Sequence, residues 1–429
     1  MRSALHRFLA IPRPVLLVLS AHLLLNLVNG SLMLTFNIYL RKLGHDDSFI
    51  ASITAHRFLP VLALSLPLGI FLRGRRLRGF FLAAAVLLPV ATWCMLVAAQ
   101  EHNETLLALA TSLWGVGLMT MQVGVMPFII RHATDETRTE AISLSFAAWS
   151  LSLLASGVAI SLLGSLDTLR IGGSEWHFDE PGILRLMVFA SLGSIPLLLA
   201  VNEPAVSDEK KLRLWHARKE YDWSLIARAS FPNLLIAVGA GLTIPFVNLF
   251  FNEVFALDSH QFSLLGGVAG VPVMAGFLIN PYVRRRFGYT TAIVLSQSLA
   301  VLFLVIMALT ELARELPGML WVAATCYLLR QPLMNMASPI TSDLAINYVG
   351  KRNRELMSAL GASIWSGSWF ISAKVFQHLR ENDFRYYQIF LITAALYLTA
   401  TSCYWLLIRD YRRVAAAEIS PSQPAVTDN

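Results

Sequence analysis

Long runs of apolar residues recur along the whole chain and are separated by short polar or basic segments. Most runs reach the roughly 20 residues that an α-helix needs to cross the hydrocarbon core of a bilayer. A membrane barrel would instead show segments of about ten residues with alternating polarity. Because lipid tolerates only helices or closed barrels, the pattern predicts an all-α membrane protein in which strands are not expected.

The breaks between these runs predict twelve transmembrane helices. The first six are expected at residues 15–40, 47–72, 79–100, 104–131, 140–165 and 183–201. The second six are expected at residues 227–255, 260–283, 289–311, 317–348, 355–379 and 386–408. Several of them are longer than a bilayer requires, which indicates tilt or extension beyond the hydrocarbon core.

A polar stretch at residues 202–226 divides the predicted helices into two sets of six. We interpret this stretch as a cytoplasmic linker between an N-terminal six-helix bundle at residues 15–201 and a C-terminal six-helix bundle at residues 227–408. A short basic lead, residues 1–14, precedes the first bundle. The tail at residues 409–429 is expected to be cytoplasmic and disordered, because it ends in small, polar and Pro-containing sequence.

The basic residues predict how the chain is oriented in the membrane. It carries 34 Lys and Arg against 27 Asp and Glu. With the N-terminus in the cytoplasm, 24 of the 34 lie on cytoplasmic segments, 7 lie on the opposite side and 3 lie within helices. Because cytoplasmic loops carry an excess of Lys and Arg, both termini are expected in the cytoplasm, with the helices in a bacterial inner membrane. The short clusters form no basic stripe or reading module, so the expected partner is the lipid bilayer and not a nucleic acid.

The two sets of helices repeat each other with an offset of about 211–216 residues. The segment from Gly30 to Asn37 resembles the segment from Gly241 to Asn248, and a cluster of Asp, His and Ser follows each of them. The next helix in each set then ends in a basic turn. Parallel repeats of six helices are typical of secondary transporters, so the repeat predicts two pseudo-symmetric bundles.

The basic turns carry a resemblance to the major facilitator superfamily, whose pattern at this place is roughly Gly-x-x-x-Asp-Arg-x-Gly-Arg-Arg. Arg73 and Arg285 stand where the family usually has Asp, and in the second copy Pro281 stands in the place of the first glycine of the pattern. The resemblance covers about residues 15–408 and implies a carrier whose first, fourth, seventh and tenth helices line a central cavity. The expected gating turns comprise Gly69, Arg73, Arg75, Arg76, Arg285, Arg286 and Gly288.

Polar side chains within the predicted helices are the main candidates for function, since an ionisable group at mid-bilayer costs at least about 2.5–3.5 kcal/mol. His22, Asn26 and Asn29 share one face of the first helix, because they are four and three residues apart. They form either a stripe that faces the substrate or hydrogen bonds that join helices. The predicted substrate-binding residues are His22, Asn26, Asn29, Arg57, Gln122, Asn248, Arg330 and Asn335.

Four further residues are candidates for coupling transport to an ion, and protons are the candidate ion: His56, Glu253, Asp343 and Lys374. Histidine is chosen because its charge changes near neutral pH. Structural alternatives stay open, because Arg57 and Lys374 can snorkel towards the bilayer surface and Asp343 can pair with the basic turn at residues 351–352. The predicted interior holds more cations than carboxylates, which favours an anionic substrate.

Other classes of function lack their sequence signals. The three cysteines, Cys94, Cys326 and Cys403, are isolated within apolar runs, so neither a metal site nor a disulfide framework is predicted. No phosphate-binding loop and no hydrolase or metalloprotease motif is present, so neither a cofactor nor enzyme activity is expected. We therefore expect a secondary active transporter that moves a small solute by alternating access. The alternative is a membrane receptor or assembly factor that has this fold and does not transport.

Overall fold

The computed structural model describes residues 10–72, 75–134, 137–166, 168–171, 174–203 and 221–419. The first part of the chain forms α2 (Arg13–Ser31), the π-helical turn η1 (Leu32–Phe36), α3 (Asn37–Lys42), α4 (Asp47–Phe71), α5 (Arg78–Gln100), α6 (Glu104–His132), α7 (Arg138–Gly164), α8 (Glu180–Leu192) and α9 (Ser194–Leu199). The second part forms α10 (Trp223–Thr243), the 3-10 turn η3 (Ile244–Phe246), α11 (Val247–Phe255), α12 (Ser259–Tyr289), the π-helical turn η4 (Thr290–Leu295), α13 (Ser296–Leu309), α14 (Met319–Tyr348), α15 (Gly350–Glu381) and α16 (Tyr386–Ile419).

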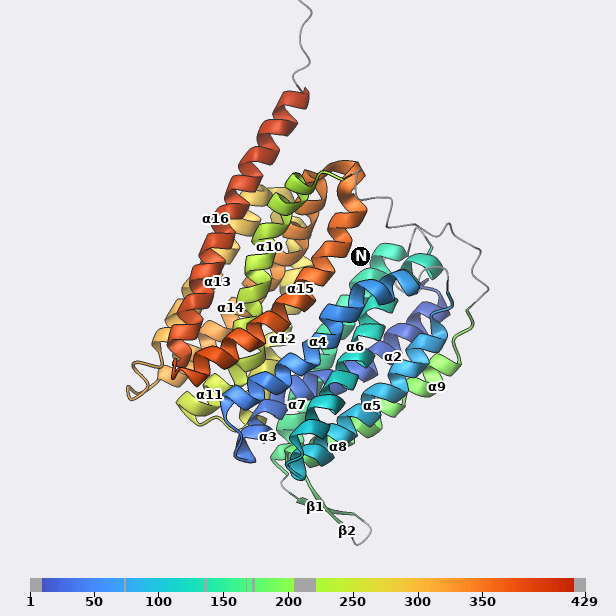
Figure 1. Cartoon of the computed structure of the whole chain (residues 1–429), viewed down its shortest axis with the longest axis vertical. Coiled ribbons are helices and arrows are strands. Elements are labelled where there is room, and N and C mark those ends of the chain that lie inside the picture. The colour runs from blue at the N-terminus through green and yellow to red at the C-terminus, as the bar shows by residue number, and fades with distance from the viewer. Residues whose placement is uncertain are drawn as a thin grey trace, which may run out of the picture.

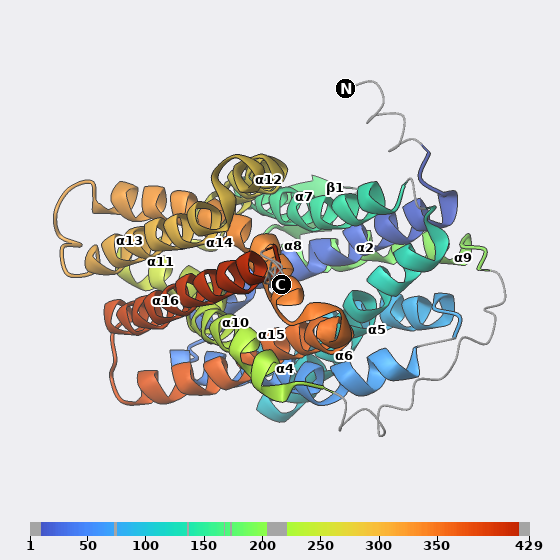
Figure 2. The same ribbon diagram turned by 90° about the horizontal axis from the view of Figure 1, so that it is seen from above.

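The helices form two groups that lie side by side (Figure 1). In that view α2 to α9 lie on the right and α10 to α16 lie on the left. The groups meet where α4 packs against α15 and where α7 packs against α12. Figure 2 shows the same two groups from above. Both contacts pair helices that are far apart in the sequence, so they set how the two parts of the chain sit relative to each other.

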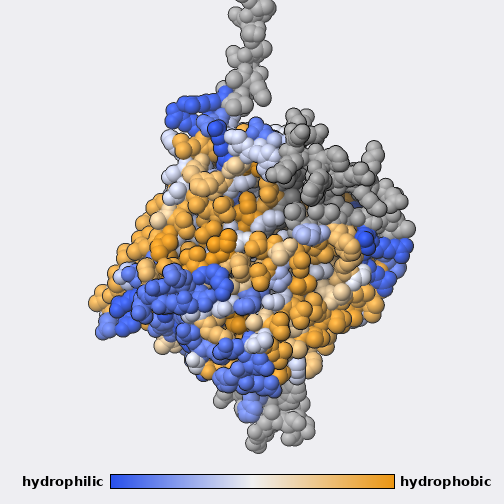
Figure 3. Space-filling view, in the orientation of Figure 1, coloured by the Kyte–Doolittle hydropathy of each residue, from blue (hydrophilic) through white to orange (hydrophobic). Residues whose placement is uncertain are grey.

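Membrane character is confirmed by the surface as well as by the helices. Nine helical segments within the described residues are long and apolar enough to cross a membrane. Figure 3 shows hydrophobic residues over the middle of one face and hydrophilic residues gathered towards its two ends. α12, α14 and α15 are not among these nine segments. Parts of α12 and α15 lie outside the residues whose side chains are described, and α14 carries Arg330, Asn335 and Asp343 along its length.

Two expectations about the segments outside the apolar runs are corrected. Strands were not expected, yet β1 (Thr168–Ile171) and β2 (Ser174–His177) pair as an antiparallel hairpin between α7 and α8. A hairpin is possible there because it lies outside the membrane-spanning helices. Water can then form hydrogen bonds with the backbone groups on its unpaired edges. The disordered tail was expected to begin at residue 409, but α16 continues to Ile419. Most of the predicted linker, residues 204–220, lies outside the described residues.

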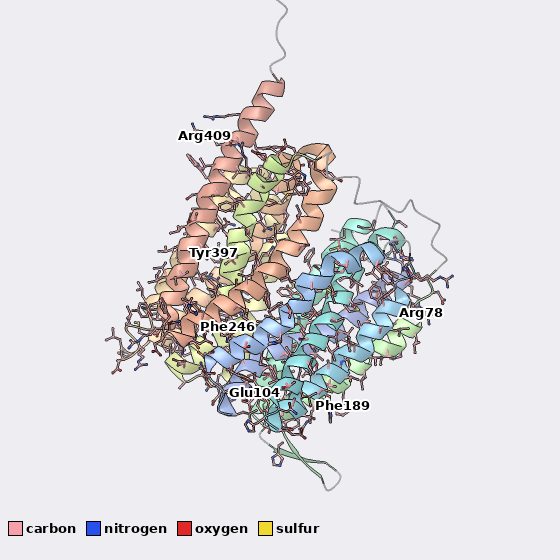
Figure 4. The ribbon with its side chains drawn as sticks, in the orientation of Figure 1. Arg78, Glu104, Phe189, Phe246, Tyr397 and Arg409 are labelled. Atoms are coloured by element: carbon pink, nitrogen blue, oxygen red, sulfur yellow. The ribbon has the colours of Figure 1, made fainter. Side chains whose placement is uncertain are left out.

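The β1–β2 hairpin marks one end of the molecule, at the bottom of Figure 1, which we call the hairpin end. The turn between α3 and α4 and the start of α6 lie at this end, where Figure 4 labels Glu104. Figure 4 places Arg78 and Arg409 towards the opposite end. The two ends differ in how the helix groups are joined, as the site residues show.

The start of α5 at the opposite end is held by Glu203, which follows α9. Its carboxylate accepts hydrogen bonds from the backbone N–H groups of Leu77, at 3.0 Å, and Arg78, at 2.9 Å. A carboxylate at a helix N-terminus satisfies free N–H groups and complements the helix dipole. We expect Glu203→Ala to destabilise the protein by about 1–2 kcal/mol, seen as a lower thermal unfolding midpoint in detergent.

Glu101→Ala is the control for this prediction, because Glu101 is exposed at the other end of the same helix. A carboxylate at a helix C-terminus is not favoured by the dipole, so its removal is expected to leave the midpoint unchanged or slightly raised. Equal losses in the two variants would contradict the proposed role of Glu203.

Candidate functional site

Two irregular turns lie at matching positions of the sequence repeat. The first long helix contains the π-helical turn η1 between α2 and α3. The seventh is interrupted by the 3-10 turn η3, which contains Pro245 and directly follows Thr243. Irregular turns of this kind inside membrane helices occur where the backbone lines a cavity. Here both turns contribute to the same cavity.

The cavity is narrow, with about 30 Å³ of space for water. Most of its wall comes from the first part of the chain, and Pro245 of η3 is the wall residue from the second part. Four helices were expected to line a central cavity. The first (α2 to α3), the fourth (α6) and the seventh (α10 to α11) contribute wall residues, and the tenth (α14) does not. The second and third helices, α4 and α5, also contribute. The wall consists of Leu32, Met33, Phe36, Asn37, Ile53, Thr54, Arg57, Met95, Thr111, Trp114 and Pro245.

Arg57 is the cation of this cavity. Its Nη2 donates a hydrogen bond of 2.6 Å to Asn29 Oδ1, and its guanidinium carbon lies 4.2 Å from the centre of the Trp114 ring. The Arg57 Nε is buried and has no hydrogen-bond partner. No Asp or Glu is among the wall residues described above. Arg57 is therefore held by an amide and an aromatic ring, without a carboxylate on the cavity wall.

The predicted polar stripe of the first helix is present and continues to the cavity. Asn29 Nδ2 donates to Asn26 Oδ1 over 3.3 Å, and Asn26 Nδ2 donates to the His22 carbonyl over 2.8 Å. The His22 side chain is only 8% exposed, and neither ring nitrogen has a partner. The structure thus joins Asn26, Asn29 and Arg57 into one hydrogen-bonded chain, with His22 at its end.

Arg330 lies elsewhere. It is 2% exposed, and its Nη2 is 3.4 Å from the Tyr397 hydroxyl on α16, within the left group of helices (Figure 4). Asn335 donates to the Gln331 carbonyl of its own helix over 2.8 Å. Neither residue is part of the cavity wall, so these two predicted binding residues are not brought together with Arg57.

The other predicted residues fall into separate environments. Lys374 is exposed and lies 2.9 Å from Gln377 of its own helix and 3.4 Å from Ser52 of α4.

Asp343, on α14, accepts a hydrogen bond from the Tyr289 hydroxyl at 2.5 Å. His56 Nδ1 is 2.8 Å from the Ser52 carbonyl. Gln122 is exposed.

Asn248 joins the two parts of the chain directly. Its side chain lies 3.4 Å from that of Asn37, its match in the sequence repeat 211 residues earlier, and Asn37 Nδ2 also donates to the Pro245 carbonyl at 2.6 Å. Equivalent residues of the two parts therefore face each other beside the cavity.

A charge cluster, which we call the Asp47 cluster, lies further towards the hairpin end. It consists of the buried Asp47 and Tyr386, the partly buried Arg41 and Arg380, and the exposed Glu253. Asp47 pairs with Arg41, accepts a hydrogen bond from the Tyr386 hydroxyl, and lies 3.0 Å from Arg380 Nε. Glu253 lies 3.0 Å from Arg41 and 3.1 Å from Arg380. Arg41 and Asp47 belong to the first part of the chain and the others to the second, so the cluster ties the two parts together.

A second contact at the hairpin end repeats this arrangement with the two parts exchanged. Glu180, the first residue of α8, accepts a hydrogen bond of 2.7 Å from Ser259, the first residue of α12. The matching contact in the Asp47 cluster joins the first residue of α4, Asp47, to the first residue of α16, Tyr386. Lys42 also lies 2.5 Å from Glu180. The hairpin end is thus closed by two related pairs of helix N-termini.

Sequence reasoning selected Glu253 and missed the rest of the Asp47 cluster, because those residues lie at helix ends where charged side chains are ordinary. The repeat carried a usable signal. Arg41 donates to Asn252 Oδ1 over 3.2 Å, and these residues are again 211 positions apart. Residues that match in the repeat and lie near the ends of the first and seventh helices are therefore the ones that meet.

The predicted gating turns lie at the opposite end. Arg131 Nη1 donates to the Arg75 carbonyl over 3.0 Å, and the Arg75 guanidinium lies 3.9 Å from the Phe71 ring. Gly288 has φ +74°, a value that L-residues rarely adopt, and it ends the first part of α12. These contacts join helices of the same group.

The remaining residues of the predicted gating turns differ in what the structure describes. Gly69 lies in α4, and a Cβ added there would meet Val123 at 3.7 Å. Arg76 and Arg286 are exposed. Arg73 lies outside the described residues, as does the side chain of Arg285.

Comparisons with known proteins agree with this architecture. The family model described as Major Facilitator Superfamily matches residues 18–373. The fold is similar to that of a bacterial homologue of the iron transporter ferroportin in the inward-facing state, with 14% identity, a TM-score of 0.70, and coverage of 92% of this chain and 98% of that one. The outward-facing state of a bacterial ferroportin homologue gives a TM-score of 0.63 at 13% identity, over 93% of this chain and 100% of that one.

The nucleoside transporter NupG is similar as well, with 12% identity, a TM-score of 0.72, and coverage of 92% of this chain and 99% of that one. No curated protein matched the chain. At these identities the solved structures show the fold alone, and the family model covers most of the chain. The chain belongs to the Major Facilitator Superfamily and has the fold of a multi-pass membrane transporter.

Proposed function

We propose that the protein is a secondary active transporter that moves a small anionic solute by alternating access. The observation that carries the proposal is the Arg57 cavity, where the two parts of the chain meet through the contacts of Asn37 with Pro245 and Asn248. A buried guanidinium without a carboxylate partner on the cavity wall favours an anionic ligand by charge complementarity.

The fold proposed for this function has twelve transmembrane helices in two pseudo-symmetric bundles. The three remaining long helices, α12, α14 and α15, complete the count, and each packs against other helices. Polar helices that pack inside a bundle can span a membrane because they need not face lipid on every side. The matching irregular turns and the two related pairs of helix N-termini support the symmetry.

The closed hairpin end corresponds to an inward-facing state if this end faces away from the cytoplasm, as the distribution of Lys and Arg predicts. The higher TM-score to the inward-facing than to the outward-facing ferroportin homologue supports the same state. Transport would then require the Asp47 cluster and the Glu180–Ser259 pair to separate. Protons are the proposed coupling ion, and His22 is the favoured carrier because neither of its ring nitrogens is engaged.

Locking the hairpin end tests alternating access. Ser48 Oγ lies 2.9 Å from Glu381 Oε1 across the two parts of the chain, so Ser48→Cys with Glu381→Cys can be crosslinked after Cys94, Cys326 and Cys403 are replaced by serine. In proteoliposomes loaded for counterflow with a panel of organic anions, sugars and nucleosides, flux should stop on crosslinking and return on reduction.

Flux that continues through fully crosslinked protein would overturn alternating access. Ligand-dependent thermal stabilisation in the absence of flux of any panel solute would support the receptor alternative. The single Ser48→Cys variant is the control, since it cannot form the crosslink.

The orientation is testable by labelling. A cysteine at the exposed His102, between α5 and α6, is expected to react with an impermeant maleimide in intact cells. A cysteine at the exposed Arg413, near the end of α16, should react only after the membrane is opened. The reverse pattern would place the hairpin end in the cytoplasm and make the structure outward-facing.

A further inference from the structure

We propose that the Arg57 cavity binds a small amphipathic monocarboxylate, with its carboxylate on Arg57 and its apolar body against the wall beside Trp114. This inference rests on the proposed function and narrows it from an anionic solute to a chemical class. It is carried by the charge of the cavity, by the free edge of the guanidinium and by the composition of the remaining wall.

The carboxylate is assigned by the unused hydrogen-bonding capacity of Arg57. One guanidinium nitrogen, Nη2, is engaged with Asn29, while the buried Nε has no partner. A buried donor without a partner costs about 1–3 kcal/mol, and a planar guanidinium edge matches the two oxygens of a carboxylate. A ligand carboxylate would supply the missing acceptor and the missing negative charge together.

A single negative charge is assigned by the number of cations. Arg57 is the one Lys or Arg among the described wall residues, and the nearest elements contribute the amide of Asn37 and the hydroxyls of Thr54 and Thr111. A dicarboxylate or a phosphate dianion would leave a second charge unpaired in a site of low dielectric, where that penalty is large. The charge balance therefore favours a monoanion.

The apolar body is assigned by the other side chains of the wall. Leu32, Ile53 and Phe36 are apolar, and Met33 and Met95 add flexible thioethers that adapt to a ligand of irregular shape. A sugar or nucleoside in the same place would bury several hydroxyl or amide groups with few partners. The cavity must widen to admit a short chain or a flat ring, because its free space of about 30 Å³ holds only one or two water molecules.

Trp114 sets the position of the anion-binding group. Its ring lies beneath the guanidinium, and the neighbouring Gly115 lets α6 approach the backbone of α4 closely, because a Cβ added at Gly115 would lie 3.2 Å from the Arg57 carbonyl carbon. The close approach of α4 and α6 fixes the position of the Arg57 backbone relative to the Trp114 indole. Trp114 is thus a specificity residue, and replacing it should weaken the binding of an aromatic ligand more than the binding of an aliphatic one.

Binding of radiolabelled hexanoate and benzoate to purified protein in nanodiscs tests the inference, with hexanamide, benzamide, succinate, inorganic phosphate and glucose as competitors. Each monocarboxylate should displace its labelled form, while the amides, succinate, phosphate and glucose should compete at least tenfold less well. Arg57→Gln should lower hexanoate affinity more than tenfold, and Arg57→Lys should lower it less. Trp114→Leu should lower benzoate affinity more than hexanoate affinity.

Arg185→Gln is the matched control, because Arg185 also stacks on an indole, Trp93 at 5.7 Å, and donates to an amide, Gln100 at 3.0 Å, but lies outside the cavity wall. This variant should bind hexanoate as the unmodified protein does. If Arg57→Gln does not fold, the competitor series on the unmodified protein still decides the class.

The outcomes separate this inference from the proposed function. Binding and uptake of succinate, phosphate, glucose or a nucleoside, with no binding of hexanoate or benzoate, would overturn the monocarboxylate and leave the transporter standing. Hexanoate binding that survives Arg57→Gln unchanged would also overturn it. Binding of hexanoate without uptake in the counterflow assay would keep the ligand class and count against transport.

Discussion

Replacing Asp47 with alanine is expected to open the hairpin end and to remove most transport activity. Asp47 is 6% exposed and faces Arg41, Arg380 and Tyr386. Without it two arginines remain close together, with Glu253 as the one carboxylate of the cluster. Removing one partner of a buried ion pair costs about 3–5 kcal/mol, and here the cost falls on the closed state alone. Uptake in proteoliposomes should therefore fall more than tenfold, because the state with a closed hairpin end becomes rare.

Asp46→Asn is the matched control for Asp47→Ala. Asp46 is the exposed neighbouring residue and accepts a hydrogen bond of 2.9 Å from the Phe49 backbone N–H. Asparagine keeps a side-chain acceptor for that bond, so uptake should stay near the level of the unmodified protein. Normal uptake in Asp47→Ala would show that the cluster does not hold the closed state.

Gly157→Ala is the second substitution with a large expected effect. α7 and α12 approach so closely at this point that an added Cβ would lie 2.6 Å from Gly267 Cα and closer still to the Ser263 carbonyl oxygen. The obstructing atoms are backbone atoms, which cannot rotate away, so the two helices must separate. Overpacking of this kind costs about 1–3 kcal/mol. We expect a lower thermal midpoint and at least a fivefold loss of uptake.

Gly79→Ala provides the comparison, because no atom lies within 4 Å of a Cβ added at Gly79 in the first turn of α5. Alanine is the better helix former by about 1 kcal/mol, so this variant should unfold at the same or a higher temperature and should transport normally. A Gly157→Ala protein that matches it in both measurements would mean that α7 and α12 are not in tight contact.

Helix positions could be predicted from the sequence because lipid leaves the backbone few choices. The expected helix at residues 79–100 is found as Arg78–Gln100, and the one at 104–131 as Glu104–His132. The length of an apolar run matches the number of helical residues that the hydrocarbon core requires. The structure differs from the prediction outside the apolar runs, where water can satisfy backbone groups: α16 extends to Ile419, and β1 and β2 form a hairpin.

The neighbours of a buried polar residue could be predicted only in part. The spacing of Asn26 and Asn29 placed them on one face of α2, and they are hydrogen-bonded to each other. Arg330 was also predicted to lie within a helix, but its place along the helix does not say which way the side chain points around the helix axis. Arg330 faces Tyr397 of α16, away from the Arg57 cavity. Such rotation depends on packing between helices, which a single sequence does not record.

The Asp47 cluster shows a second reason why sequence reasoning was incomplete. Arg41 and Tyr386 are 345 residues apart, yet Arg41 Nη2 lies 2.8 Å from the Tyr386 hydroxyl. Contacts between the two parts of the chain depend on how the groups of helices sit against each other, and that geometry is set by the packing of α4 on α15 and of α7 on α12.

Distance measurements by electron spin resonance test most directly whether the two groups of helices alternate. One pair of spin labels, at His102 and Glu315, spans the hairpin end, and a second pair, at Arg76 and Arg412, spans the opposite end; all four positions are exposed. In nanodiscs each pair should give two distance populations. Asp47→Ala should lengthen the hairpin-end distances and shorten those at the opposite end. A single distance for each pair, unchanged by Asp47→Ala, would contradict alternating access.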